Sequence, residues 1–153
     1  MANHDLPSRV AEQFGISAGR VHVTGTPDVP PPPPLNAKAK EKDVQRLLVK
    51  WAWNHPDTRL HLLRSIGNDG RRVFAKGRVP GTPDLLLPVP SGSFGALWLE
   101  LKRPSGDLSD NQHDQMQALE RFGHAVDVAW TPKQGAFVLR NYLYDPASFL
   151  SGW

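Results

Sequence analysis

The segment PDLLLPVPSGSFGALWLELK, residues 83–102, holds two apolar runs on either side of a stretch rich in Pro, Ser and Gly. This pattern predicts two consecutive β-strands joined by a turn-rich connection. Each run carries an acid at one end: Asp84 opens the first run, and Glu100 closes the second, two residues before Lys102. If the two strands pair as a hairpin, Asp84 and Glu100 meet at the same end of it.

The second strand places its charged side chains on one face. Because side chains alternate across a strand, Trp98, Glu100 and Lys102 share one face and three leucines share the other. Two neighbouring carboxylates repel unless a cation lies between them, and their hard oxygen ligands suit Mg²⁺ or Mn²⁺. Such a metal can polarise a phosphate and acidify a bound water, which Lys102 can orient or deprotonate. Either acid alone is commonly structural, but together they favour a metal-dependent hydrolytic site.

A helix is expected before this hairpin, within residues 36–55. Its apolar positions recur at helical spacing and define one face: Val44, Leu48, Trp51 and Ala52. Glu41 and Gln45, four residues apart, fall on the same face. Polar groups that face a core need polar partners, so both residues become candidates for the same site as the two acids.

Four further segments complete the expected order: a strand at 58–66, a helix at 108–123, a strand at 124–130 and a helix at 131–143. Ser109 is the expected N-cap of the first of these helices, and Gly123 its end. Thr131 is the expected N-cap of the second helix. The order helix, three strands, helix, strand, helix predicts an α/β sheet with helices on its faces.

Composition limits the classes of protein that need to be considered. The 153 residues, 39% hydrophobic and 22% charged, suit one globular domain. The absence of Cys excludes a disulfide framework and a thiolate metal site. No apolar run reaches the ~18 residues of a membrane helix, so we expect a cytoplasmic protein with no membrane partner. A net charge of +3 favours polyanionic partners slightly.

The N-terminal part differs in composition from the rest of the chain. Residues 29–35 predict a stiff polyproline linker between an extension at 1–28 and a domain at 36–150. The prolines could instead recruit a partner with an aromatic groove. Within the extension, residues 10–21 fit either a short amphipathic helix or part of a DNA-reading helix-turn-helix, and the sequence leaves both open.

These motifs resemble the VRR-NUC family of the PD-(D/E)xK nuclease superfamily, in the short stand-alone form common in phages. The points of match are EKDVQ, GTPDLLL, WLELKRPSGDLSDNQ and FGHAV, within about residues 36–145. The resemblance implies a restriction-endonuclease-like core with a mixed four-stranded sheet flanked by helices. It also implies a Mg²⁺- or Mn²⁺-dependent DNA endonuclease acting on junctions, flaps and repair or replication intermediates, in a bacterial or phage-infected cell.

Roles for the metal ligands and the catalytic lysine follow from the same resemblance. Asp84, Glu100 and the main-chain carbonyl of Leu101 match the metal ligands, and Lys102 matches the catalytic lysine. Glu41 matches a helical acid that completes the metal site directly or through water.

Gln45 and Gln112 match glutamines near the family's site. For Gln112 an alternative stays open, because Ser109 and Gln112 also have the spacing of a capping box. The segment RSIGNDGRR, residues 64–72, lacks a histidine that is frequent in the family. We expect this difference to affect substrate contacts and to leave the metal chemistry unchanged.

Basic residues near the acids are the expected DNA contacts: Arg71, Arg72, Lys76, Arg78 and Arg103. Such contacts to phosphate fix the position of DNA and carry no sequence information. Two alternatives from other classes remain, a non-catalytic DNA-binding module with this fold and an accessory protein. Clustered acids argue against a pure binder, because carboxylates repel phosphate. A homodimer is a further expectation, since a nuclease with one site commonly pairs with a second copy to cut two strands.

Overall fold

The computed structural model describes residues 27–66 and 79–151. Within this part of the chain, one sheet contains four strands in the order β1-β2-β3-β4. Their bounds are Arg64–Ser65 for β1, Leu85–Leu87 for β2, Leu97–Leu101 for β3 and Ala125–Ala129 for β4. The first three strands pair antiparallel, and β4 lies parallel to β3. The prediction of a mixed four-stranded sheet is confirmed.

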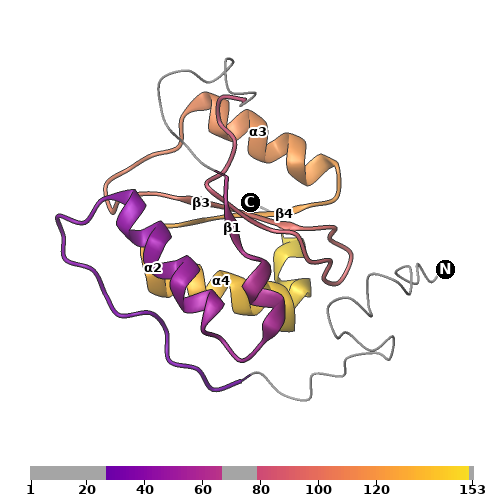
Figure 1. Cartoon of the computed structure of the whole chain (residues 1–153). Coiled ribbons are helices and arrows are strands. Elements are labelled where there is room, and N and C mark those ends of the chain that lie inside the picture. Colours follow the sequence, from indigo (N-terminus) through magenta and orange to yellow (C-terminus); the bar gives the residue numbers. More distant parts are fainter. Residues whose placement is uncertain (1–26, 67–78, 152–153) are drawn as a thin grey trace.

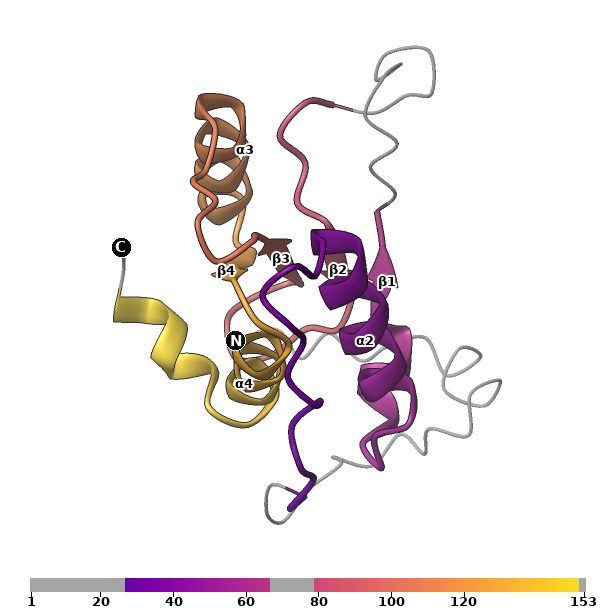
Figure 2. The same cartoon turned by 90° about the vertical axis from the view of Figure 1, so that its left-hand side faces the viewer.

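Helices cover both faces of this sheet. Helices α2 (Glu41–Trp53) and α4 (Pro132–Tyr144) lie on one face, and α3 (Asp110–Arg121) lies on the other (Figure 1). Figure 2 shows the same layers after a quarter turn, with α3 separated from α2 and α4 by the strands. Helix α4 is followed by a short 3₁₀ helix, η3 (Pro146–Ser151).

The alternation predicted for β3 separates two hydrophobic clusters. Leu85 and Leu87 of β2 and the leucines of β3 join Leu48 of α2 and Leu139 of α4 in the larger cluster, on the α2 and α4 face. On the opposite face, Trp98 packs with Met116 of α3 in a smaller cluster. Glu100 and Lys102 follow Trp98 at two-residue intervals, so their side chains leave the strand toward α3.

Residues 58–66, which the sequence predicted as a strand, form mainly a 3₁₀ helix. This helix, η1, spans Thr58–Leu62, and only two of the residues after it belong to β1. Asp57 caps η1 by accepting a hydrogen bond from the main-chain N–H two residues further on. Leu60 and Leu63 are both buried, and their three-residue spacing matches one turn of a 3₁₀ helix. The strand prediction was wrong over most of this segment, because the run also fits a period of two but its buried leucines follow a period of three.

The proline segment lies against the folded domain, although it forms neither helix nor strand. The carbonyl of Pro30 accepts a hydrogen bond of 2.8 Å from the indole Nε1 of Trp51 in α2. Pro32 is buried. The segment also borders a cavity of about 480 Å³ whose far side includes Arg103 and Trp130. The prolines therefore contact α2 and border the same cavity as the loop that follows β3.

The predicted helix ends are confirmed. The hydroxyl of Ser109 accepts a hydrogen bond from the main chain of Gln112 at the start of α3. Gly123 follows α3 with a φ of 85°, a conformation that glycine adopts at little cost. Thr131 caps α4 in the same way as Ser109 caps α3. None of the helices in residues 27–66 and 79–151 is long and apolar enough to cross a membrane.

Candidate active site

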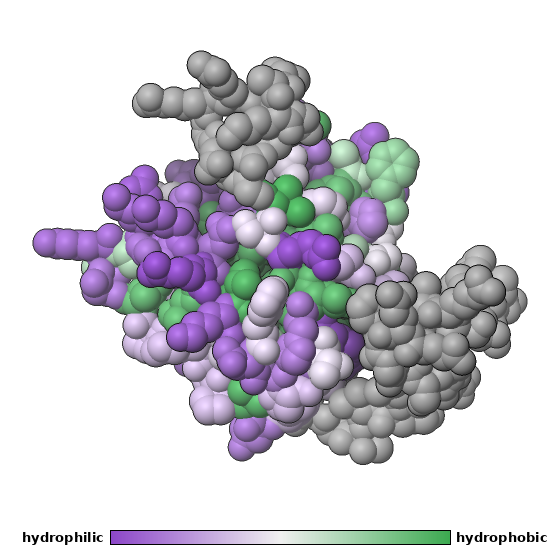
Figure 3. Space-filling model, viewed as in Figure 1, coloured by the Kyte–Doolittle hydropathy of each residue, from purple (hydrophilic) through white to green (hydrophobic). Residues whose placement is uncertain are grey.

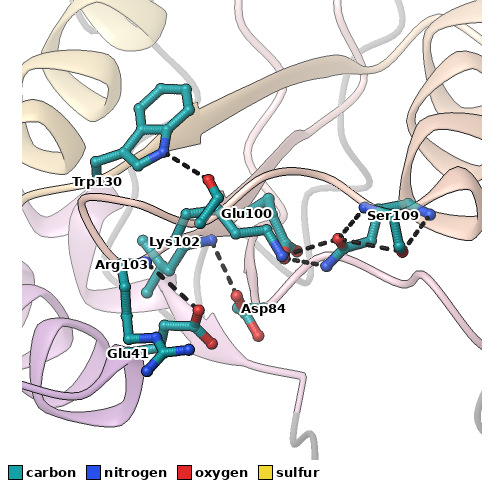
Figure 4. Close-up of polar contacts among 10 residues, drawn as sticks. Glu41, Asp84, Glu100, Lys102, Arg103, Ser109 and Trp130 are labelled. Carbon is teal, nitrogen blue, oxygen red and sulfur yellow. Dashed lines mark hydrogen bonds and ion pairs between the residues drawn. The ribbon is translucent and has the colours of Figure 1, made fainter.

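The β2–β3 hairpin brings the two predicted acids together. Leu85 is the register partner of Leu99 in this antiparallel pair, so Asp84, one residue before Leu85, lies opposite Glu100, one residue after Leu99. The main-chain N–H of Leu101 donates a hydrogen bond of 2.9 Å to Oδ2 of Asp84. Figure 4 shows Asp84 close to Glu100 and Lys102 at this end of the strands. The expectation that the acids meet at one end of the hairpin is confirmed.

Glu100 is a buried acid with an incomplete set of partners. Its side chain is almost inaccessible to solvent, since the residue is only 2% exposed. Burial, the nearby charge of Asp84 and, least of these, the charge of Glu41 raise the pKa of Glu100 to about 7, against the opposing effect of Lys102. In the described part of the chain, Oε2 of Glu100 has no hydrogen-bond partner. A buried carboxylate in this state is stabilised by any cation that reaches it.

Lys102 and Gln112 hold the other oxygen of Glu100. The ammonium of Lys102 lies 3.2 Å from Oε1 of Glu100 and donates a hydrogen bond of 2.8 Å to Oε1 of Gln112. The amide Nε2 of Gln112 donates to the same oxygen of Glu100. Gln112 also forms the capping box with Ser109. Gln112 therefore takes part in the capping box of α3 and also contacts Glu100 and Lys102.

Glu41 reaches the same region from α2. It is the first residue of the helix, and its Oε1 accepts a hydrogen bond of 3.4 Å from the main-chain N–H of Arg103. Its charge is among the causes of the raised pKa of Glu100. Figure 4 shows Glu41 on the side of Lys102 and Arg103 opposite to Ser109. The helical acid is thus near the hairpin acids, as its place on the helix face predicted.

The remaining candidates lie further out or beyond the described residues. Gln45 donates a hydrogen bond to the hydroxyl of Ser65 in β1, the register partner of Leu85. Arg103 is exposed beside Lys102. The four other basic candidates lie outside the described residues: Arg71, Arg72, Lys76 and Arg78.

Two residues that support the site were not predicted. Trp130 donates a hydrogen bond of 3.2 Å to the carbonyl of Gly106, which fastens the loop after Lys102 to the end of β4. Gly81 has a φ of 85°, and a Cβ there would meet the carbonyl oxygen of Asn111 at 2.1 Å. The turn before Asp84 therefore packs directly against the start of α3. A glycine within the turn-rich PGTPD motif was a usable signal for this contact, whereas the sequence held none for Trp130.

The donor chemistry of the site suits a hard divalent cation. Three carboxylates, from Glu41, Asp84 and Glu100, are close enough for two of them to influence the pKa of the third. In the described part of the chain, no three acidic or imidazole side chains form a ready metal-binding group. Asp84 and Glu41 each accept a main-chain hydrogen bond with one carboxylate oxygen. The oxygen of Glu100 that lacks a partner is the observation that fits a cation.

The fold and these contacts define a nuclease-like α/β domain. The VRR-NUC domain model matches residues 33–131, and the chain belongs to this family. A solved structure described as a VRR_NUC domain protein shares the fold with a TM-score of 0.57. It is 17% identical in sequence, and the match covers 67% of this chain and 87% of that chain. No curated protein matches this chain significantly.

Proposed function

We propose that this protein is a Mg²⁺- or Mn²⁺-dependent DNA endonuclease of the PD-(D/E)xK type. The expected substrates are structured DNA molecules such as junctions, flaps and repair or replication intermediates. Membership of the VRR-NUC family supports nuclease chemistry and DNA as the substrate. The observation that carries the proposal is the buried Glu100, which meets Asp84 and Lys102 and lacks a partner for one oxygen within the described residues.

Four groups would hold the metal ion: Asp84, Glu100, Glu41 and the main-chain carbonyl of Leu101. When bound, the ion would polarise a phosphate oxygen and lower the pKa of a coordinated water. Glu100 is central to this preference, because its buried carboxylate has an oxygen without a hydrogen-bond partner within the described residues and lies beside the charge of Asp84, which a cation would offset. Hard oxygen ligands and the absence of Cys favour Mg²⁺ or Mn²⁺ over softer ions.

Lys102 is the proposed catalytic residue for charge neutralisation. Its ammonium is held between Glu100 and Gln112, at 3.2 and 2.8 Å, so its position is fixed before DNA binds. From there it stabilises negative charge on the phosphate or orients the attacking water. Water attacks phosphorus in line with the departing 3′ oxygen. Gln112 is a positioning residue, since it contacts Glu100 and Lys102 with the two ends of one amide.

The proposed DNA contacts lie around this site. Arg103 is exposed and follows Lys102 directly, and this position supports a contact with a phosphate next to the cleaved one. We also propose as phosphate contacts the basic residues that precede Asp84 in the sequence: Arg71, Arg72, Lys76 and Arg78. Their alanine variants would weaken binding at every sequence and reduce the salt dependence by about one unit of slope per lost contact.

A cleavage assay tests the function directly. Plasmid, flap and four-way junction DNA are incubated with the protein in Mg²⁺, in Mn²⁺ and in chelator. We expect metal-dependent cleavage that Asp84→Asn and Lys102→Ala both abolish. Asp114→Asn is the matched control, because Asp114 is an exposed acid of α3. DNA binding without cleavage under any metal condition would instead support the non-catalytic module.

A further inference from the structure

A groove of about 560 Å³ lies outside the candidate active site, where α2 borders the edge strand β1. Its lining includes three cationic residues of α2, at positions 42, 46 and 50, together with Trp53 and Ser65. None of the residues that line it within the described part of the chain is acidic. In the view of Figure 3, the side of the molecule on which α2 lies is covered mainly by hydrophilic side chains.

The cations of this groove form a regular row. Lys42, Arg46 and Lys50 follow one another at four-residue intervals, so they lie along one side of the helix. All three are exposed. Arg46 makes an ion pair of 3.5 Å with Asp43, but its side chain is 83% exposed, and such surface pairs are weak. The row extends about 12 Å along the helix axis, which is long enough to reach more than one phosphate of a strand.

Trp53 adds an aromatic surface at the same groove. The residue is 61% exposed, which is unusual for so large an apolar side chain. Its indole does not turn freely, because Nε1 donates a hydrogen bond of 3.2 Å to the carbonyl of Leu63. A ring that is fixed in position and open to solvent is suited to stacking with a nucleic-acid base. An acidic peptide would use the cations but would have no need of this ring.

Helix α2 connects the groove to the active site. Its first residue, Glu41, contacts the main chain of Arg103 next to Lys102, and its last residue is Trp53. We propose that the groove binds a single-stranded segment of the DNA substrate, with the cationic row on its phosphates and Trp53 stacked on a base. This proposal rests on the proposed nuclease function and assigns it a second contact surface.

Binding measured in chelator tests the groove separately from catalysis. Fluorescence anisotropy follows a labelled single-stranded oligonucleotide and a fully paired duplex across a salt series. For Lys42→Gln/Lys50→Gln we expect weaker binding and a salt slope for the single strand that falls by about 1.4, at ~0.7 per lost contact. For Trp53→Ala we expect about tenfold weaker binding of the single strand and little change for the duplex.

Matched controls address charge and exposed aromatic area. Arg121→Gln/Lys133→Gln removes two exposed charges elsewhere, and Phe122→Ala removes an aromatic side chain that is 80% exposed. Equal effects of test and control variants would overturn the proposal. The proposal would also be overturned if polyglutamate binds and the lysine variants weaken this binding while Trp53→Ala does not, because a surface for acidic proteins would behave in this way. If the protein cleaves DNA but the groove variants bind the single strand as well as the wild type does, only the groove proposal is refuted. If the groove variants weaken binding but the protein shows no metal-dependent cleavage, only the nuclease function is refuted.

Discussion

The side-chain amide of Gln112 donates a hydrogen bond to Glu100 and, through its carbonyl oxygen, accepts one of 2.8 Å from Lys102. The same oxygen accepts a hydrogen bond of 2.9 Å from the main-chain N–H of Ser109. One side chain therefore joins the start of α3 to the buried acid and the lysine. The position of α3 and the geometry of the candidate site depend on each other through this residue.

This double role predicts different results for the two partners in the capping box. Gln112→Ala should reduce the cleavage rate by about 10- to 100-fold, because Glu100 and Lys102 lose the group that orients them. Ser109→Ala should cost about 1 kcal/mol of stability through the lost helix cap and leave the rate nearly unchanged, because the main-chain N–H of Ser109 still bonds to the side chain of Gln112. Single-turnover cleavage measures the rate of each variant, and denaturant unfolding measures its stability. Gln117→Ala, an exposed glutamine of α3, is the control, and equal rates for Gln112→Ala and this control would contradict the role.

The hairpin and its acids could be predicted because they depend on local pattern. Alternation in residues 97–102 fixes which side chains share a face, and the turn-rich connection fixes the antiparallel pairing. Those two facts place Asp84 opposite Glu100 and Lys102 beside it. The helix that carries Glu41 was also predictable, since its apolar face is regular.

Contacts between distant segments could not be predicted in the same way. The indole of Trp51 bonds to Pro30, and Gln45 bonds to Ser65, across 21 and 20 residues respectively. No local pattern specifies such pairs. The misassigned strand at 58–66 had a different cause, because Asp57 caps a 3₁₀ turn there and a short apolar run fits both periods.

Gly81 offers a test of the contact between the Asp84 turn and α3. Gly81 and Gly123 share a φ of 85°, but an added Cβ meets Asn111 only at Gly81 and has nothing within 4 Å at Gly123. Gly123→Ala should therefore cost about 1–2 kcal/mol for the backbone conformation alone. Gly81→Ala should cost more and should also reduce cleavage. Equal unfolding free energies for the two variants would show that the turn can move away from α3 without penalty.

Glu100 predicts a particular dependence of stability on pH when no metal is present. Its pKa rises from 4.5 to about 7 on folding, so between these values the folded state keeps a proton that the unfolded chain releases. Stability should therefore fall as pH rises through this window, by up to about 3 kcal/mol. Glu100→Gln should remove this part of the slope, and millimolar Mg²⁺ should reduce it in the wild type. Denaturant unfolding in chelator across the window measures it, and parallel slopes for the two proteins would contradict the assignment.

The proline segment should contribute to stability and not to chemistry. A chain that starts at Asn36 keeps every described candidate site residue but loses buried Pro32 and the hydrogen bond from Trp51 to Pro30. We expect a lower melting temperature, corresponding to about 1–3 kcal/mol, with cleavage retained where the protein remains folded. A chain that starts at Pro27 is the control. Trp51→Phe, which keeps the ring and removes the donor, should reproduce about 1 kcal/mol of the loss.

Asp84→Asn distinguishes a metal ligand from a purely structural acid. An asparagine oxygen can still accept the hydrogen bond from Leu101, and the change removes repulsion between Asp84 and Glu100. In chelator the variant should therefore be at least as stable as the wild type.

In Mg²⁺ the order of stability should reverse. Metal at ~100 times its Kd stabilises the wild type by about 2.7 kcal/mol, and the variant should lose most of this gain because a neutral amide is a poorer ligand for a hard cation. Thermal melts of both proteins in chelator and in Mg²⁺ measure the reversal, with Asp114→Asn as the control. A variant that is less stable in chelator and keeps the full Mg²⁺ shift would exclude Asp84 from the metal site.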